Sequence, residues 1–147
     1  EMVALFRVEL RSYKGIVSKP NIEAGREEME EYLSAKFPVY AALLNGEYAG
    51  YVVCRVDSEV VWVESIYVRE EYRRHGVATA LHSKAEEIAA SYGDDTVYNY
   101  VHPNNHRMIE FLRKRGYTVL NLIEIRKPYK KEKLTQTIKV GEHEFDY

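Results

Sequence analysis

The 147-residue sequence contains a single cysteine, Cys54. One cysteine excludes a disulfide within the chain, and it also excludes a zinc site built from several cysteines. The first residues lack the long apolar segment and the small-residue cleavage site of a signal peptide. Both absences predict an intracellular, cytoplasmic protein.

The sequence also has little net charge and no long apolar run. Lys and Arg together number 21 against 23 Asp and Glu, a net charge of −2, so we expect no nucleic-acid partner. No apolar stretch approaches the roughly 20 residues of a membrane-spanning helix, so we expect no membrane partner. The length and the 46% hydrophobic content predict one globular domain over residues 1–147.

Apolar periodicity and turn residues predict the element order β-α-β-β-β-α-β-α-β-β. This order indicates an α/β (α+β mixed) fold, in which helices flank a mixed, mostly antiparallel sheet. The predicted elements are a strand over 3–12, a helix over 21–38 capped by Asn21, a hairpin over 40–56 turning at Asn45-Gly46, a strand over 59–68, a helix ending near Tyr92, a strand over 96–101, a helix over 104–116, a strand over 117–127, a polar loop over 128–133 and a hairpin over 137–147.

The segment EEYRRHGVATAL, residues 70–81, places cationic side chains at a helix start. Arg73, Arg74 and His75 precede Gly76, although the helix N-terminus already carries partial positive charge. Such an arrangement suits a bound phosphate, because helix N–H groups and forked guanidinium groups donate to its oxygens. Neither GxxxxGK[ST] nor GxGxxG occurs, which excludes a P-loop and the dinucleotide fingerprint. A solvated basic turn before an ordinary helix is the alternative.

Residues 73–78, Arg-Arg-His-Gly-Val-Ala, resemble the pyrophosphate-loop signature of the GCN5-related N-acetyltransferase (GNAT) family. That signature is Arg or Gln, two residues, Gly, one residue, then Gly or Ala. A second segment, VHPNNHRMIEFLRKRGY (101–117), resembles the family's V-x-x-x-N-x-x-A-I-x-x-Y-x-x-x-G-F pattern. Two positions depart from it, since Met108 replaces Ala and Leu112 replaces Tyr. The matching positions are Val101, Asn105, Ile109, Gly116 and, as another aromatic residue at the Phe position, Tyr117.

The resemblance implies a GNAT-like sheet whose parallel strands, 59–68 and 96–101, splay to form a cleft for acetyl-CoA. Backbone groups of the first strand would pair with the pantetheine amides. The loop before the helix would hold the pyrophosphate, and Asn105 would hold the cofactor arm. We expect no metal, because Pro103 interrupts the His102/His106 pair. The implied cofactor-binding residues are Ile66, Tyr67, Val68, Arg73, Arg74, His75, Gly76, Val77, Ala78 and Asn105.

The resemblance also implies N-acetyl transfer, in which a primary amine attacks the thioester directly in a ternary complex. Glu64 is the first candidate for the base, because it interrupts an apolar strand, on the face that we assign to Ile66 and Val68. Pairing with a basic residue is its alternative role. Tyr100 and His102 are further catalytic candidates, and packing against a helix is the alternative for each.

Two other functions remain open at this stage. Leu112 cannot protonate the leaving thiolate, which keeps a non-catalytic acyl-CoA sensor or structural module as the alternative. Binding of another phosphate, including RNA backbone, is disfavoured by the net charge. The acceptor class is open among protein amino groups, small amines and antibiotics.

The segment 137–147 could pair with a second subunit, so a homodimer is considered. We expect His82 on the solvated side of its helix.

Overall fold

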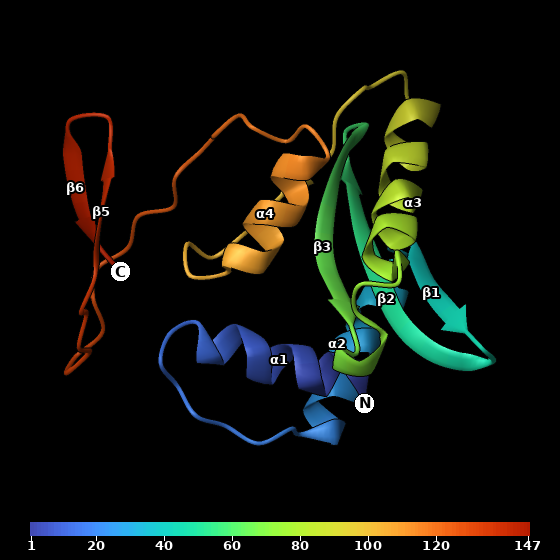
Figure 1. Cartoon of the computed structure of the whole chain (residues 1–147), viewed down its shortest axis with the longest axis horizontal. Helices are drawn as coiled ribbons and strands as arrows, with labels where there is room; N and C mark the ends of the chain where they lie inside the picture. Colours follow the sequence, from blue (N-terminus) through green and yellow to red (C-terminus); the bar gives the residue numbers. More distant parts are fainter. The chain divides into compact units, whose positions relative to one another are not determined.

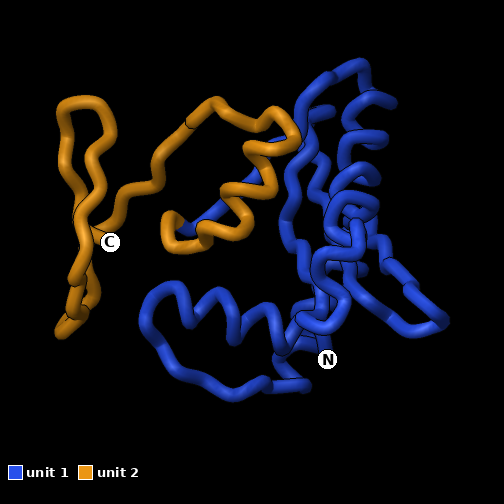
Figure 2. Tube along the Cα trace, in the orientation of Figure 1, with its two compact units in different colours: residues 1–102 blue, residues 103–147 orange.

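The computed structural model describes all residues from Glu1 to Tyr147, and the chain divides into two compact units (Figure 2). Unit 1 is residues 1–102 and unit 2 is residues 103–147. Unit 1 holds α1 (Met2–Ser12), α2 (Ile22–Ser34), β1 (Val39–Leu44), β2 (Glu47–Asp57), β3 (Val60–Val68), the 3-10 turn η1 (Glu70–Tyr72), α3 (Val77–Ser91) and β4 (Tyr98–Asn99) (Figure 1). Unit 2 holds α4 (His106–Lys114), β5 (Thr137–Val140) and β6 (His143–Asp146). The structure divides the chain into two units by its contacts, and the single domain over residues 1–147 remains a prediction.

The sheet of unit 1 has the order β1-β2-β3-β4. The first three strands are antiparallel, and β4 joins β3 in parallel, which confirms the predicted mixed sheet. Asn45 and Gly46 form the β1–β2 turn with φ values of +53° and +84°. Positive φ at both central residues matches the right-handed twist of the flanking strands, so the predicted hairpin is confirmed.

Both faces of this sheet are covered by helices. One face carries Tyr51, Val53 and Tyr67, which pack in a cluster with Val3 of α1 and with partly buried residues of α2. On the opposite face α3 packs on β2 and β3, over side chains such as the fully buried Val52. Successive residues of β2 thus enter two different halves of the core, as the period of a strand requires.

Cys54 lies in the α3 half of the core and is fully buried. Burial raises the pKa of its thiol to about 11. The thiol therefore stays protonated at neutral pH and serves as a small apolar side chain.

The predicted strand over 3–12 is wrong, because these residues form α1. The short apolar run VALF reads equally well as a strand or as a helix face. Helical spacing brings Val3 and Phe6 onto the sheet, and Ala4 onto α2. A Cβ on Gly25 of α2 would lie 2.8 Å from the Ala4 backbone nitrogen, so the two helices meet at a close crossing.

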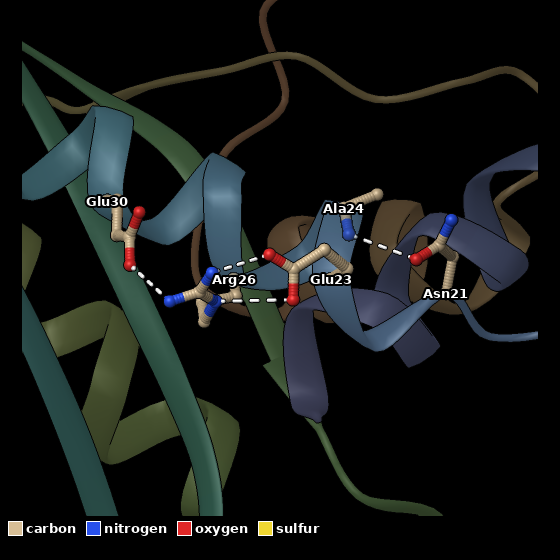
Figure 3. Close-up of polar contacts among 5 residues, drawn as sticks. All are labelled: Asn21, Glu23, Ala24, Arg26 and Glu30. Carbon is tan, nitrogen blue, oxygen red and sulfur yellow. Dashed lines mark hydrogen bonds and ion pairs between the residues drawn. The ribbon is translucent and has the colours of Figure 1, made fainter.

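The predicted helix over 21–38 is confirmed as α2, which ends four residues before Pro38. Figure 3 shows the predicted cap, in which the Asn21 side chain accepts a 3.0 Å hydrogen bond from the Ala24 N–H. It also shows Arg26 bridging Glu23 and Glu30 on the exposed side. Such exposed pairs are screened by water and contribute little, so this acidic surface is mainly a solvated helix face.

Two further strand predictions differ from the structure, one in unit 1 and one in unit 2. Ladder pairing within 96–101 is limited to Tyr98–Asn99, and residues 117–127 form no strand. A β-rich sequence forms a strand only beside a partner strand, and the structure pairs none with 117–127. The last hairpin is confirmed as β5–β6, turning at Gly141, and residues 128–133 form the predicted loop. None of the helices has the length and apolar content needed to cross a bilayer.

Candidate functional site

The parallel pairing of β3 with β4 stops after two residue pairs, Trp62 with Tyr98 and Val63 with Asn99. β3 continues to Val68, so within the sheet of unit 1 its residues 64–68 have no partner on the β4 side. The unpaired N–H and C=O groups of a strand edge can bind an extended ligand that carries amides. This unpaired edge includes the residues for which the family resemblance implies pairing with a pantetheine arm.

A β-bulge lies at Glu64, where the unpaired edge begins. Val53 pairs with Ser65 and Cys54 pairs with Val63, which leaves Glu64 without a residue opposite. Bulges bend a strand and redirect a side chain, and they are frequent next to active sites.

The bulge corrects the strand face that the sequence assigns to Glu64. Ile66 and Val68 pair with Val52 and Gly50, on the face covered by α3. The Glu64 carboxylate instead lies 3.1 Å from the Arg55 Nε, and about a third of the side chain is exposed. The alternative role for Glu64, pairing with a basic residue, is therefore present as the ion pair with Arg55. The exposed part of the Glu64 side chain could still be reached by a substrate.

Aromatic rings from β3, from β4 and from the residue after β4 lie in contact beside this ion pair. The Trp62 ring lies 4.8 Å from the Tyr98 ring and 4.9 Å from the Tyr100 ring, measured between centroids. The Arg55 guanidinium lies 5.1 Å from the Trp62 ring centre. Tyr98 and Tyr100 thus both lie against Trp62, but only the Tyr100 ring is stacked on it, with 12° between the ring planes, whereas the Tyr98 ring is tilted by 35°. Tyr100 remains 65% exposed, which leaves its hydroxyl open to ligands.

His102 lies three residues beyond β4 and stacks on Tyr13, with 6.2 Å between ring centroids and 17° between ring planes. Burial and the nearby charge of Lys14 lower the pKa of His102 below its usual 6.5. The imidazole is therefore neutral at pH 7 and can accept a proton. The three predicted catalytic residues thus have separate neighbours, namely Arg55, Trp62 and Tyr13.

Protein stability should depend on the protonation of His102. Because its folded-state pKa lies below the unfolded value, the unfolded state binds more protons as the pH falls through 6.5. We expect a stability loss from about pH 6.5 downward, and a smaller loss in His102→Phe, which keeps the ring stack. Urea unfolding between pH 5 and 7.5 measures this difference, and identical slopes in both proteins would contradict it.

The loop over residues 73–76 joins η1 to α3 and has a helix start suited to an anion. Gly76 takes the N-cap position with a φ of +78°, a conformation that favours glycine, and it has no side chain to cap the helix. The first backbone bond of the helix runs from the Ala80 N–H to the Gly76 oxygen. The N–H groups of residues 77–79 are therefore left without an acceptor in the helix.

The cationic side chains of this loop are placed differently from one another. Arg74 and His75 are exposed, and the His75 Nδ1 lies 2.8 Å from the Arg73 carbonyl oxygen. The Arg73 side chain is directed inward, because its Nε donates to the Val68 oxygen at 3.0 Å and its Nη2 lies 2.9 Å from the Glu9 Oε2. The sequence predicts both arginines as phosphate ligands, whereas here the Arg73 guanidinium is paired with Glu9 and only Arg74 is an exposed residue.

His82 is the site-adjacent residue that the sequence misplaces. Its side chain is fully buried, so the predicted solvated position is wrong. The Nε2 lies 3.2 Å from the Asn99 Oδ1, and the Nδ1 lies 3.4 Å from the Glu86 Oε1. His82 therefore ties α3 to the last residue of β4, where the parallel pairing ends. Only the tertiary position of β4 creates this burial, and no local pattern could reveal it.

The middle of the downstream motif forms α4 of unit 2 and the cap at its start. The Asn105 Oδ1 accepts a 3.1 Å hydrogen bond from the Met108 N–H, so Asn105 is the N-cap of α4. Leu112 is 7% exposed and forms part of the apolar side of α4. Its side chain offers no proton, as the sequence already indicates.

Comparisons with known proteins agree with this architecture. The family described as the acetyltransferase (GNAT) family matches residues 2–117. An uncharacterized N-acetyltransferase of Methanocaldococcus jannaschii is 32% identical over 81 residues, which are 50% of this chain and 36% of that protein. The chain thus spans about a third of that relative's length.

Solved structures show the same fold. A probable acetyltransferase gives a TM-score of 0.62 at 25% identity, over 87% of this chain and 89% of that one. The aminoglycoside N-acetyltransferase AAC(6')-Iy, in complex with a bisubstrate analogue of CoA and acetylneamine, gives 0.61 at 22% identity, over 73% and 80%. The family match covers most of the chain, and the sheet with its parallel pair agrees with it. The chain belongs to the acetyltransferase (GNAT) family.

Proposed function

We propose that the chain transfers an acetyl group from acetyl-CoA to a primary amine. The observation that carries this proposal is the course of the chain from β3 into α3. An unpaired strand edge over 64–68 leads into a turn that ends in the uncapped start of α3. Acetyl-CoA carries amides along its pantetheine arm and a pyrophosphate beyond them. The strand edge suits the amides and the start of α3 suits the pyrophosphate, in the same order along the chain.

The cofactor residues follow from this match. Backbone groups of Ile66, Tyr67 and Val68 bind the pantetheine amides. The N–H groups of Val77 and Ala78, with the exposed Arg74 and His75, bind the pyrophosphate, and Gly76 permits the turn. Arg73 contributes through its place in the loop, and Asn105 follows from the family motif. The complex of the aminoglycoside N-acetyltransferase with the bisubstrate analogue gives a precedent on the same fold.

The reaction requires a neutral amine, whose lone pair attacks the thioester carbonyl. The C–N bond forms, the tetrahedral intermediate collapses, and the C–S bond breaks to release the CoA thiolate. Glu64, at the bulge beside the unpaired edge, takes the proton from the amine directly or through water. The exposed Tyr100 hydroxyl is the candidate donor to the thiolate, and His102, which is neutral at pH 7, is the second candidate base.

Acetyl-CoA should raise the Tm of the protein, because a ligand that binds only the folded state stabilises it. At a concentration of 100 times Kd the stabilisation is about 2.7 kcal/mol, which shifts the Tm of a domain of this size by several degrees. Thermal unfolding with and without acetyl-CoA measures the shift. Acetate and adenosine at equal concentration serve as controls, and an unchanged Tm at saturating acetyl-CoA overturns the proposal.

Turnover separates the enzyme from a module that only binds the cofactor. We expect free thiol to appear when acetyl-CoA and an amine are present together, and not with either alone. A panel should include lysine-bearing peptides, peptide N-termini, small monoamines and aminoglycosides. Binding of acetyl-CoA without thiol release for any amine would instead support the sensor function.

A further inference from the structure

We propose that Glu9 of α1 is a positioning residue that fixes the two segments leaving β3 and β4, and that cofactor binding depends on it. The inference rests on the proposed function, since it concerns the affinity of the same site for CoA. Glu9 lies in the last turn of α1, and its side chain is 22% exposed. The two carboxylate oxygens hold two different parts of the chain.

The first oxygen holds the loop that follows β3. The Glu9 Oε2 lies 2.9 Å from the Arg73 Nη2, while the Arg73 Nε donates to the oxygen of Val68, the last residue of β3. The same guanidinium lies 5.7 Å from the centre of the Tyr67 ring. Arg73 is thus fixed between the helix, the strand end and an aromatic ring. A charge-assisted pair of this kind also gives the loop a defined orientation.

The second oxygen bonds Tyr13, which in turn contacts the segment that follows β4. The Tyr13 hydroxyl donates to the Glu9 Oε1 at 2.6 Å, and the Tyr13 ring stacks on His102. His102 comes three residues after the end of β4. The stack therefore places the chain beyond β4 against the end of α1, on the same helix that holds the loop beyond β3.

One carboxylate thus connects the two segments where the parallel strands part. The pantetheine arm of the proposed cofactor would bind along residues 64–68, and its pyrophosphate would bind at the start of α3. Both positions lie in the stretch of chain that runs from the second half of β3 to the start of α3, and Arg73 anchors this stretch to Glu9. A small displacement of a binding loop has a large effect on a ligand that contacts it at several points.

The ion pair between Glu9 and Arg73 also gives the two arginines of the loop different roles. Because Glu9 and Val68 occupy the Arg73 guanidinium, the exposed Arg74 remains as the side chain that meets an incoming anion. Loss of Glu9 removes the partner of a half-buried cation and frees it to reorient. The loop then loses its fixed geometry, although all of its own residues are unchanged.

Glu9→Gln tests this role, since glutamine keeps the shape and an oxygen for the Tyr13 hydroxyl but removes the charge that Arg73 binds. We expect the Kd for CoA, measured by calorimetry, to rise about tenfold, because the loop loses its anchor. In turnover assays the KM for acetyl-CoA should rise similarly, while kcat and the KM for the amine change less than about twofold. A purely structural role would not divide the kinetic constants in this way.

Glu28→Gln is the matched control. Glu28 is also half-buried, also pairs with an arginine of the α1–α2 region, Arg7, and also accepts a hydrogen bond from a tyrosine, Tyr32. It does not touch the loop after β3. We expect a similar decrease in Tm for both variants, but an unchanged Kd for CoA in Glu28→Gln. The double variant Glu9→Gln/Arg73→Gln should bind CoA no more weakly than Arg73→Gln, because both changes remove the same pair.

The outcomes distinguish this inference from the proposed function. Absence of CoA binding by the wild-type protein overturns both. Wild-type binding with an unchanged Kd in folded Glu9→Gln overturns the inference alone, as does equal weakening in Glu28→Gln. Should Glu9→Gln fail to fold, Tyr13→Phe tests the second link, because it keeps the stack on His102 and removes the hydroxyl bond. It should raise the Kd about threefold, and an unchanged Kd there overturns the inference.

Discussion

Replacing Glu64 by glutamine is expected to lower kcat about 100-fold, with the Kd for CoA changed less than about twofold. The expectation follows from the bulge, which turns this carboxylate to the side of Arg55 and Trp62, while the backbone edge proposed for the cofactor begins at the same residue. Glutamine retains the shape and an acceptor oxygen but cannot hold the proton that leaves the amine. Binding of CoA depends on backbone groups farther along β3 and is therefore spared.

Initial rates of thiol release, measured from pH 6 to 9 with a saturating amine, test this role. The rate of the variant should rise with pH over the whole range, because free deprotonated amine then replaces the lost base. Asp57→Asn is the control, since Asp57 approaches the same Arg55 at 4.0 Å but lies at the end of β2, away from the bulge. Its rate should match the wild type. Equal rates for Glu64→Gln and wild type across the pH range would remove Glu64 as the base and direct attention to His102.

The sequence predicts best those features that a few neighbouring residues determine. The Asn45-Gly46 turn needs only two residues with positive φ, and both have it. The loop at residues 73–76 needs a glycine before a helix start, and Gly76 occupies the N-cap. The cap at Asn21 is equally local, since its side chain accepts a hydrogen bond from an N–H three residues away. Features of this kind do not depend on what lies across the core.

The features that the sequence mispredicts depend on a partner distant in the chain. Residues 3–12 form a helix because its apolar side packs on β3 and on Gly25 of α2. The direction of Glu64 depends on a register shift against β2, which no count of alternating residues reveals. The Arg73 side chain pairs with Glu9, which lies 64 positions earlier in the chain. The turns and caps around the candidate site could thus be predicted from the sequence, but the directions and partners of its side chains could not.

Replacing Gly50 by alanine is expected to lower the free energy of unfolding by about 2–3 kcal/mol and to weaken CoA binding as well. A Cβ at Gly50 would lie 2.6 Å from the Tyr67 carbonyl oxygen, 3.3 Å from the Val68 Cα and 3.1 Å from the Leu81 Cδ1. The first two atoms belong to the backbone of β3. They cannot give way unless the end of that strand moves, and that end carries the carbonyl that holds Arg73.

Gly93→Ala separates this steric effect from the general cost of replacing a glycine. Nothing lies within 4 Å of a Cβ at Gly93, so only its φ of +83° resists alanine, at a cost of about 1–2 kcal/mol. Urea unfolding should therefore rank the two variants by stability, and calorimetry should show weaker CoA binding in Gly50→Ala alone. If both variants bind CoA like the wild type, the end of β3 can move without affecting the site. The unpaired strand edge would then not be where the cofactor arm binds, because an arm held by those backbone groups must respond to their displacement.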